Sequence, residues 1–173
     1  DTQTSRGLGD VYKRQGPNAQ INNSKVGQGS KVLNSVVDDS IIDAGGQIGP
    51  FAHIRPGSEL GENVKVGAFA ETKKSKIGKG SKIPHLAYVG DAELGTGVNF
   101  SAGAITVNYD GKNKHKTDID DGAFIGSDVM LVAPVTIGKE SMIGAGSVIT
   151  KDVPSKALGI ERNDQKNIEG YVD

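Results

Sequence analysis

Aliphatic residues recur at every sixth position over most of this chain. One unbroken run consists of Ile119, Ile125, Leu131, Ile137, Ile143 and Ile149. A second run consists of Ile42, Ile48, Ile54, Leu60 and Val66, and a third, in a shifted register, of Ile77, Ile83 and Val89. A spacing of six does not build the apolar stripe of an α-helix, which needs spacings of three and four. In a β-strand, residues two apart point to the same side, so short strands accommodate the pattern.

These aliphatic residues have a small or β-branched residue two positions before them, and many have a glycine directly after them. Ser58 precedes Leu60 and Gly61 follows it, for example. The small and the large side chain then share one side of a short strand, and the glycine permits a sharp turn. Three such units close a triangular coil of about 18 residues, and coils stack as a parallel β-helix. The sequence therefore predicts an all-β fold of about seven or eight coils.

A narrow interior filled by pairs of one small and one large side chain also explains the low aromatic content and the many glycines. Aromatic residues make up only 5% of the chain, Trp is absent, and the 25 Gly residues are about twice the average usage. A Gly-rich β-sandwich with accidental spacing is the alternative, and six consecutive matches argue against it.

Charge and cysteine content exclude several classes of function. The net charge of −1 indicates neither a nucleic-acid nor a membrane partner. The chain has no Cys, which excludes disulfides, thiolate metal sites and a Cys nucleophile and fits a reducing compartment. No apolar run is long enough for a membrane span or a signal peptide. We therefore expect a cytoplasmic location.

The two ends of the chain do not follow the repeat. Residues 1–20 contain no six-residue units, and the first fifteen resemble translated non-native sequence. We expect a β-helix domain over residues 21–154 and a polar tail over residues 155–173. The repeat is interrupted once, by "NYDGKNKHKTD" at residues 108–118, which predicts one extruded loop.

Two cations break the rule that glycine follows the aliphatic position. Arg55 follows Ile54, and Lys73 follows Thr72, which stands in an aliphatic slot. Because they are one full coil apart, we expect them to stack on neighbouring strands. Like charges on neighbouring strands repel each other and are destabilising, and an anion bound between them would replace this repulsion with attraction. Without a ligand, the two long side chains would splay into water.

A histidine and a glycine-rich stretch suggest acyl-transfer chemistry. His85 lies fourteen residues after Glu71, nearly one coil, so the carboxylate could orient the imidazole ring of a general base. A lone histidine in a repeat protein is more often structural than catalytic, so a structural role is the alternative. The small residues of "SAGA", at 101–104, allow backbone N–H groups to approach an oxyanion closely.

Three motifs in order, "RPG", "HLAYVGDAE" and "NYDG", resemble a specific enzyme family. The chain is similar, from about residue 21 to 171, to the C-terminal acetyltransferase domain of the bifunctional N-acetylglucosamine-1-phosphate uridyltransferase / glucosamine-1-phosphate acetyltransferase. The resemblance implies a left-handed β-helix and a homotrimer with its site between subunits. It implies acetyl transfer from acetyl-CoA to the amine of glucosamine 1-phosphate, without a metal, for UDP-N-acetylglucosamine synthesis. The family's nucleotidyltransferase half is not seen, so we expect no uridyltransferase activity.

The resemblance also implies roles for individual residues. The sugar phosphate would be held by Arg55, Lys73, Tyr88 and Asn99, with Lys114 of the loop facing the anionic ligands. His85 would be the general base, Glu71 would orient it, and the N–H of Ala102 would meet the oxyanion. Acetyl-CoA would be bound by Ala102, Asn108, Tyr109, Ser127, Ala145 and Arg162.

The chain departs from the family pattern at a few positions. Pro84 replaces a Gly before His85, which restricts Ile83 and removes one N–H. The other departures are Ala87 and Ala104, where Thr is usual, and Ser101, where Gly is usual. Arg162 lies in a divergent tail.

Two other classes use the same coil. A zinc carbonic-anhydrase-like trimer needs two His close together in the sequence and a third nearby, whereas His53, His85 and His115 are separated from one another by more than a full coil. A non-catalytic β-helix presents regular Thr or apolar faces, and no Thr ladder is present here.

Overall fold

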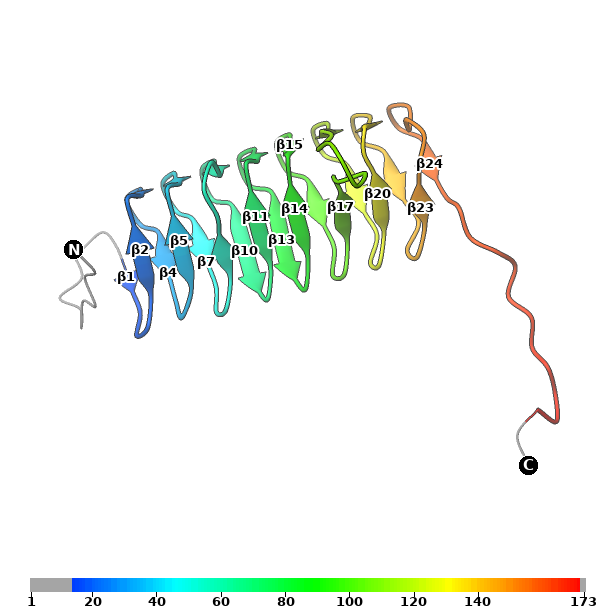
Figure 1. Ribbon diagram of the computed structural model, residues 1–173, viewed down its shortest axis with the longest axis horizontal. Helices are drawn as coiled ribbons and strands as arrows, with labels where there is room; N and C mark the ends of the chain where they lie inside the picture. Colours follow the sequence, from blue (N-terminus) through cyan, green and yellow to red (C-terminus); the bar gives the residue numbers. More distant parts are fainter. Residues whose placement is uncertain (1–13, 172–173) are drawn as a thin grey trace.

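The computed structural model describes residues 14–171, which contain 24 short strands and no helix. Successive strands turn in the same sense and stack into a long solenoid (Figure 1). All strand pairs are parallel: Ile54 pairs with Thr72, for example, and Thr72 with Val89. No helix among the described residues is long and apolar enough to cross a membrane.

The solenoid has three flat faces, which we name sheets A, B and C. Sheet A consists of β1 (Arg14–Gln15), β4 (Lys31–Val32), β7 (Gln47–Ile48), β10 (Lys65–Ala68), β13 (Lys82–His85), β16 (Asn99–Phe100), β19 (Phe124–Ile125), β22 (Met142–Ile143) and β24 (Leu158–Gly159). Sheet B consists of β2 (Gln20–Asn22), β5 (Val36–Asp38), β8 (His53–Ile54), β11 (Glu71–Lys73), β14 (Tyr88–Gly90), β17 (Ile105–Val107), β20 (Met130–Val132) and β23 (Val148–Ile149). Sheet C consists of β3 (Lys25–Val26), β6 (Ile41–Ile42), β9 (Glu59–Leu60), β12 (Lys76–Ile77), β15 (Ala92–Leu94), β18 (Thr117–Ile119) and β21 (Val135–Ile137).

The aliphatic residues of the repeat fill the interior. Ile54, Leu60 and Ile125 are almost fully buried, and so are the small residues that precede them, such as Ser58. This arrangement confirms the predicted left-handed β-helix of hexapeptide repeats. Because each interior layer holds only three large side chains, the core has room for few rings, and Phe100 is the largest side chain in it.

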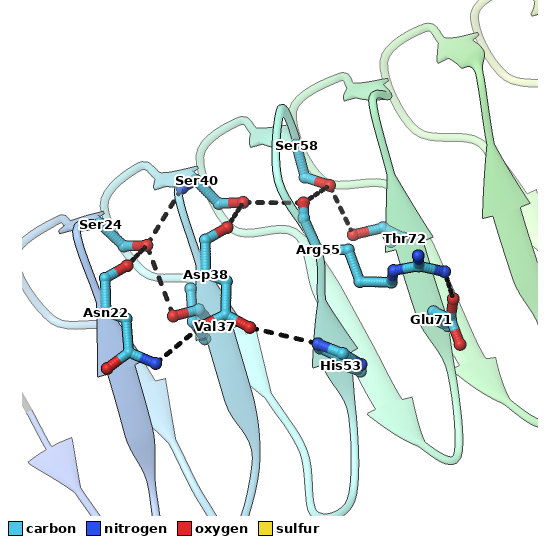
Figure 2. A network of polar contacts seen from close by, with 10 residues as sticks. All are labelled: Asn22, Ser24, Val37, Asp38, Ser40, His53, Arg55, Ser58, Glu71 and Thr72. Atoms are coloured by element: carbon cyan, nitrogen blue, oxygen red, sulfur yellow. Dashed lines mark hydrogen bonds and ion pairs between the residues drawn. The ribbon is translucent and has the colours of Figure 1, made fainter. Parts of the chain in front are cut away.

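Buried serines close the corner between sheets B and C (Figure 2). The hydroxyl of Ser40 donates to the carbonyl of Arg55 at 3.0 Å, and the hydroxyl of Ser58 donates to the same carbonyl at 2.7 Å. Thr72 then donates to Ser58 Oγ at 3.0 Å. These bonds satisfy polar groups that the corner would otherwise bury unpaired, and they fix the backbone at Arg55.

The solenoid is longer than the expected range of residues 21–154. At one end Gln15 of β1 pairs with Val32, and at the other Gly159 of β24 pairs with Ile143. The expected boundaries were wrong because Gln15 and Gly159 occupy aliphatic slots without an aliphatic side chain. Most of the segment expected to be non-native, residues 1–13, lies outside the described residues, as do residues 172–173.

The extruded loop lies between β17 and β18, and it is ordered by its own hydrogen bonds. The carboxylate of Asp110 accepts from the backbone N–H groups of Asn113 at 2.7 Å and Lys112 at 2.8 Å, and its other oxygen lies 2.6 Å from His115 Nε2. These contacts, the Asn113 bond foremost, hold the pKa of Asp110 well below its usual range. After β24 the chain leaves the solenoid as an extended tail (Figure 1).

Candidate functional site

Two cations lie side by side on the outer surface of sheet B. Register places Ile54 beside Thr72, so Arg55 and Lys73, the residues that follow, are neighbours, as their spacing predicts. The N–H of Arg55 donates to the Thr72 carbonyl at 2.8 Å. With its own carbonyl held by two serines, Arg55 has a backbone fixed on both sides.

Glu71 is the partner of the Arg55 side chain (Figure 2). Its Oε1 lies 2.5 Å from Arg55 Nη1, and the hydrogen bond raises the pKa of Arg55. Both side chains are about one-third exposed, so water screens the pair and its contribution to stability is small. The pair therefore serves mainly to orient the guanidinium.

A third cation, Lys114, reaches the same place from the loop. Lys114 lowers the pKa of Lys73, and Arg55 adds a smaller effect in the same direction. Lys114 Nζ also lies 3.9 Å from Asp91 Oδ2. Three cations that repel one another at this edge of sheet B make a site that favours an anion.

The polar groups beside these cations come from β14 and from the start of the loop. Asn108 is buried, and its Nδ2 donates to Asp91 Oδ2 at 2.5 Å and to the hydroxyl of Tyr88 at 3.4 Å. Tyr88 in turn is the register partner of Glu71. The structure thus brings together Arg55, Lys73, Tyr88, Asn108 and Lys114. Sequence reasoning missed Asp91, although it lies within the "HLAYVGDAE" motif.

A second group follows the corner between sheets A and B. The carbonyl of Ala102 accepts from Asp128 N at 2.9 Å, and the carbonyl of Ser127 accepts from Gly146 N at 2.8 Å. Arg162 Nη1 donates to the carbonyl of Ala145 at 3.0 Å. Ala102, Ser127 and Ala145 therefore stand above one another on successive turns, with Arg162 at the end of the column.

His85 belongs to this second group. It is exposed at the end of β13, and the register of Lys82 with Asn99, continued for three residues, aligns it with Ala102. Asn99 is also on sheet A, where its Nδ2 donates to Ser101 Oγ at 2.8 Å. Tyr109 is exposed in the loop and donates from its hydroxyl to the Gly111 carbonyl at 2.7 Å.

One chain does not bring Glu71 to His85. Glu71 faces outward from sheet B, where it binds Arg55, whereas His85 ends a strand of sheet A. The register partner of Glu71 on the next coil is Tyr88, which comes three positions after His85 in the sequence. A spacing of fourteen residues therefore falls short of one coil and ends on the preceding face. The roles of both residues stay predictions.

The three histidines lie apart from one another. His53 is on β8 with its Nε2 3.3 Å from Asp38 Oδ2, His115 is bonded to Asp110 in the loop, and His85 is on β13. Among residues 14–171, no group of three or more His, Cys, Asp or Glu side chains is arranged to hold a metal ion. The placement of the histidines gives no support to the zinc anhydrase alternative.

The repeat has a counterpart among known families. Residues 116–151 match the family described as bacterial transferase hexapeptide (six repeats). The repeat of this segment is thus of the kind found in the bacterial hexapeptide transferases. The structure of UDP-N-acetylglucosamine acyltransferase from Francisella novicida superposes on the fold with a TM-score of 0.76 at 18% identity, covering 87% of this chain and 63% of that one. A point mutant of perosamine N-acetyltransferase from Caulobacter crescentus, in complex with CoA and GDP-perosamine, has a TM-score of 0.60 at 21% identity, covering 75% and 82%.

Relatives of higher identity share one description, Bifunctional protein GlmU. The protein of Shouchella clausii is 58% identical over 153 residues, which cover 88% of this chain and 34% of the relative. That of Halalkalibacterium halodurans is 55% identical over 170 residues, which cover 98% and 37%. The chain thus spans about a third of the length of these relatives. The matches confirm the resemblance to the C-terminal hexapeptide acetyltransferase domain of such a protein.

Proposed function

We propose that the chain transfers an acetyl group from acetyl-CoA to the amine of glucosamine 1-phosphate. The product, N-acetylglucosamine 1-phosphate, would serve UDP-N-acetylglucosamine synthesis in the cytoplasm. The observation that carries the proposal is the cluster of Arg55, Lys73 and Lys114 on one edge of sheet B, which suits a phosphate. The identity of 58% with a bifunctional GlmU protein supports the same reaction.

The chemistry needs a base, an oxyanion donor and a held thioester. His85 would take a proton from the sugar amine, whose nitrogen then attacks the thioester carbonyl carbon. The N–H of Ala102 would stabilise the oxyanion of the tetrahedral intermediate, which collapses to the amide as the CoA thiolate leaves and is protonated. The column of Ala102, Ser127, Ala145 and Arg162, with Asn108 and Tyr109 of the loop, would hold acetyl-CoA.

The division of these residues between two faces supports a homotrimer. Arg55, Lys73, Tyr88 and Lys114 lie on sheet B or beside it, whereas His85 and Asn99 lie on sheet A. If one copy presents its sheet B to the sheet A edge of the next, the phosphate-binding cations and the base meet. A stable monomer with full activity in sedimentation and assay would rule out this arrangement.

The test of the reaction is release of free thiol from acetyl-CoA. We expect thiol release that depends on glucosamine 1-phosphate and persists after treatment with a chelator. No release with pure protein and both substrates would overturn the proposal. Stoichiometric zinc together with hydration of carbon dioxide would favour the anhydrase alternative.

A further inference from the structure

Asp91 makes contact with both ends of the extruded loop. It lies at the corner between β14 and β15, and its Oδ2 accepts from Asn108, the residue at which the chain leaves the coil. Its backbone carbonyl accepts from the N–H of Thr117 at 3.2 Å, where the chain re-enters the coil. The same Oδ2 lies 3.9 Å from Nζ of Lys114, inside the loop.

Asp91 also connects the loop to the sheet B cations. Its N–H donates to the carbonyl of Lys73 at 2.9 Å. The negative charge of Asp91 partly offsets the effect of Lys114 on Lys73, whose pKa Asp91 raises and Lys114 lowers. One side chain, about one-fifth exposed, therefore neutralises part of the repulsion that Lys114 and Lys73 exert on each other.

The corner itself does not require an aspartate. Asp91 has a φ of 48°, and the same corner one and two coils earlier is occupied by Lys74 with a φ of 46° and Gly57 with a φ of 79°. A lysine and a glycine thus make this turn as well as an acid does. The carboxylate at position 91 must be explained by what it binds.

We propose that Asp91 is a positioning residue that clamps the loop of residues 108–116 onto the coil. The clamp holds Lys114 beside Lys73, where the sugar phosphate would bind, and it fixes Asn108, which would contact acetyl-CoA. The inference rests on the proposed function for the roles of Lys114 and Asn108, but the clamp itself does not depend on any substrate.

Two substitutions separate the contacts of the carboxylate. Asp91→Gly removes the side chain and tolerates the positive φ, so the backbone is not strained. Asp91→Asn also tolerates this conformation and keeps an oxygen that accepts from Asn108, but it has no charge for Lys114. Asp39→Gly is the matched control, because Asp39 stands at the same corner with a φ of 41° and contacts none of the proposed site residues.

The first measurement is limited trypsin digestion without substrate, with mass spectrometry of cleavage after Lys112, Lys114 and Lys116. We expect Asp91→Gly to accelerate loop cleavage about 10-fold, the effect of losing a hydrogen bond to a charged group. Asp91→Asn and Asp39→Gly should stay within about 3-fold of the parent. Cleavage in Asp91→Gly no faster than in Asp39→Gly would overturn the clamp.

The second measurement is the KM of each substrate. We expect Asp91→Gly to raise the KM of glucosamine 1-phosphate about 10-fold, and Asp91→Asn to raise it less while leaving the KM of acetyl-CoA at the parental value. Faster cleavage with both KM values unchanged would overturn the positioning role. If the parent itself releases no thiol, the proposed function fails, and the digestion still decides the clamp.

Discussion

Cations stack one coil apart on two faces of the solenoid. On sheet A, Lys65 of β10 is the register partner of Lys82 of β13, and both are exposed. On sheet B, Arg55 lies beside Lys73. Lys65 and Lys82 have no ion pair within residues 15–171, whereas Glu71 pairs with Arg55, and Asp91 and Lys114 act on Lys73.

The difference shows that a stack of like charges is not by itself a binding site. A solenoid repeat places side chains above one another on every face, so lysines will align wherever they are frequent. Long side chains on a free face can splay into water. On sheet B the backbone of Arg55 is bonded on both sides and its guanidinium is held by Glu71. Fixed cations that cannot move apart gain most from an anion.

The largest expected effect tests what sheet A contributes. His85 stands at the end of the strand that carries Lys82, and we expect His85→Ala to lower kcat by about 10²- to 10⁴-fold, the range of a positioned general base. The variant should keep its fold and its binding of acetyl-CoA. His53→Ala and His115→Ala are the controls in the same thiol-release assay. Near-normal turnover of His85→Ala, with a large loss of turnover in His115→Ala, would show that the general base lies in the loop.

The comparison of the two stacks predicts a difference in phosphate binding. Arg55→Ala and Lys73→Ala should each raise the KM of glucosamine 1-phosphate by roughly 10- to 150-fold, since each removes a charge-assisted contact of ~1.5–3 kcal/mol. The KM of acetyl-CoA should change much less. Lys65→Ala and Lys82→Ala should leave both values within about 2-fold. An equal rise in the KM of glucosamine 1-phosphate for both pairs of variants would mean that the net positive charge of the surface, and not the fixed pair of Arg55 and Lys73, binds the phosphate.

The pH dependence of affinity sharpens the role of the loop. Because Lys114 lowers the pKa of Lys73, Lys73 loses its charge at a lower pH than an ordinary lysine. Affinity for glucosamine 1-phosphate should therefore fall as the pH rises through that lowered pKa. In Lys114→Ala, affinity for glucosamine 1-phosphate should be several-fold weaker at neutral pH. The pH at which this affinity falls should be higher than in the parent, because Lys73 then keeps its charge to a higher pH. Calorimetric titrations between about pH 7 and 10 measure both effects, and an unmoved pH profile would contradict the coupling.

The smallest expected effect concerns Glu71. Because its carboxylate holds Arg55 and the pair is partly exposed, Glu71→Gln should raise the KM of glucosamine 1-phosphate by less than about 5-fold. The kcat should stay within about 2-fold of the parent. A loss of 10-fold or more in kcat, with KM unchanged, would show instead that Glu71 orients His85 in the assembled protein.

Much of this architecture can be predicted from the sequence, because spacing determines a solenoid. Thr72 occupies an aliphatic slot of the repeat, and that position alone places Lys73 beside Arg55. The prediction was wrong at the ends, where Gln15 and Gly159 fill slots without the expected side chains.

The contacts of the loop could be predicted only in part. Asp91 and Asn108 lie one coil apart and continue the register of Tyr88 with Ile105, so spacing relates them, whereas Lys114 belongs to no repeat position and no spacing rule predicts its contact with Asp91. Glu71 and His85 do not meet within one chain because fourteen residues fall short of one coil. The register partner of Glu71 is Tyr88, three positions after His85.

The loop also has a consequence for chain-closure entropy. Leu94 pairs with Ile77 of the coil before it and with Ile119 of the coil after it, and the loop makes the second connection the longer one. Closure entropy grows only with the logarithm of the span, so the longer excursion costs about 0.3 kcal/mol more than an ordinary coil. An insertion of one residue within a strand, by contrast, would turn its buried side chains outward. The corner between β17 and β18 is therefore where segments can be lengthened or exchanged with little loss of stability, provided that Ile119 still returns to Leu94.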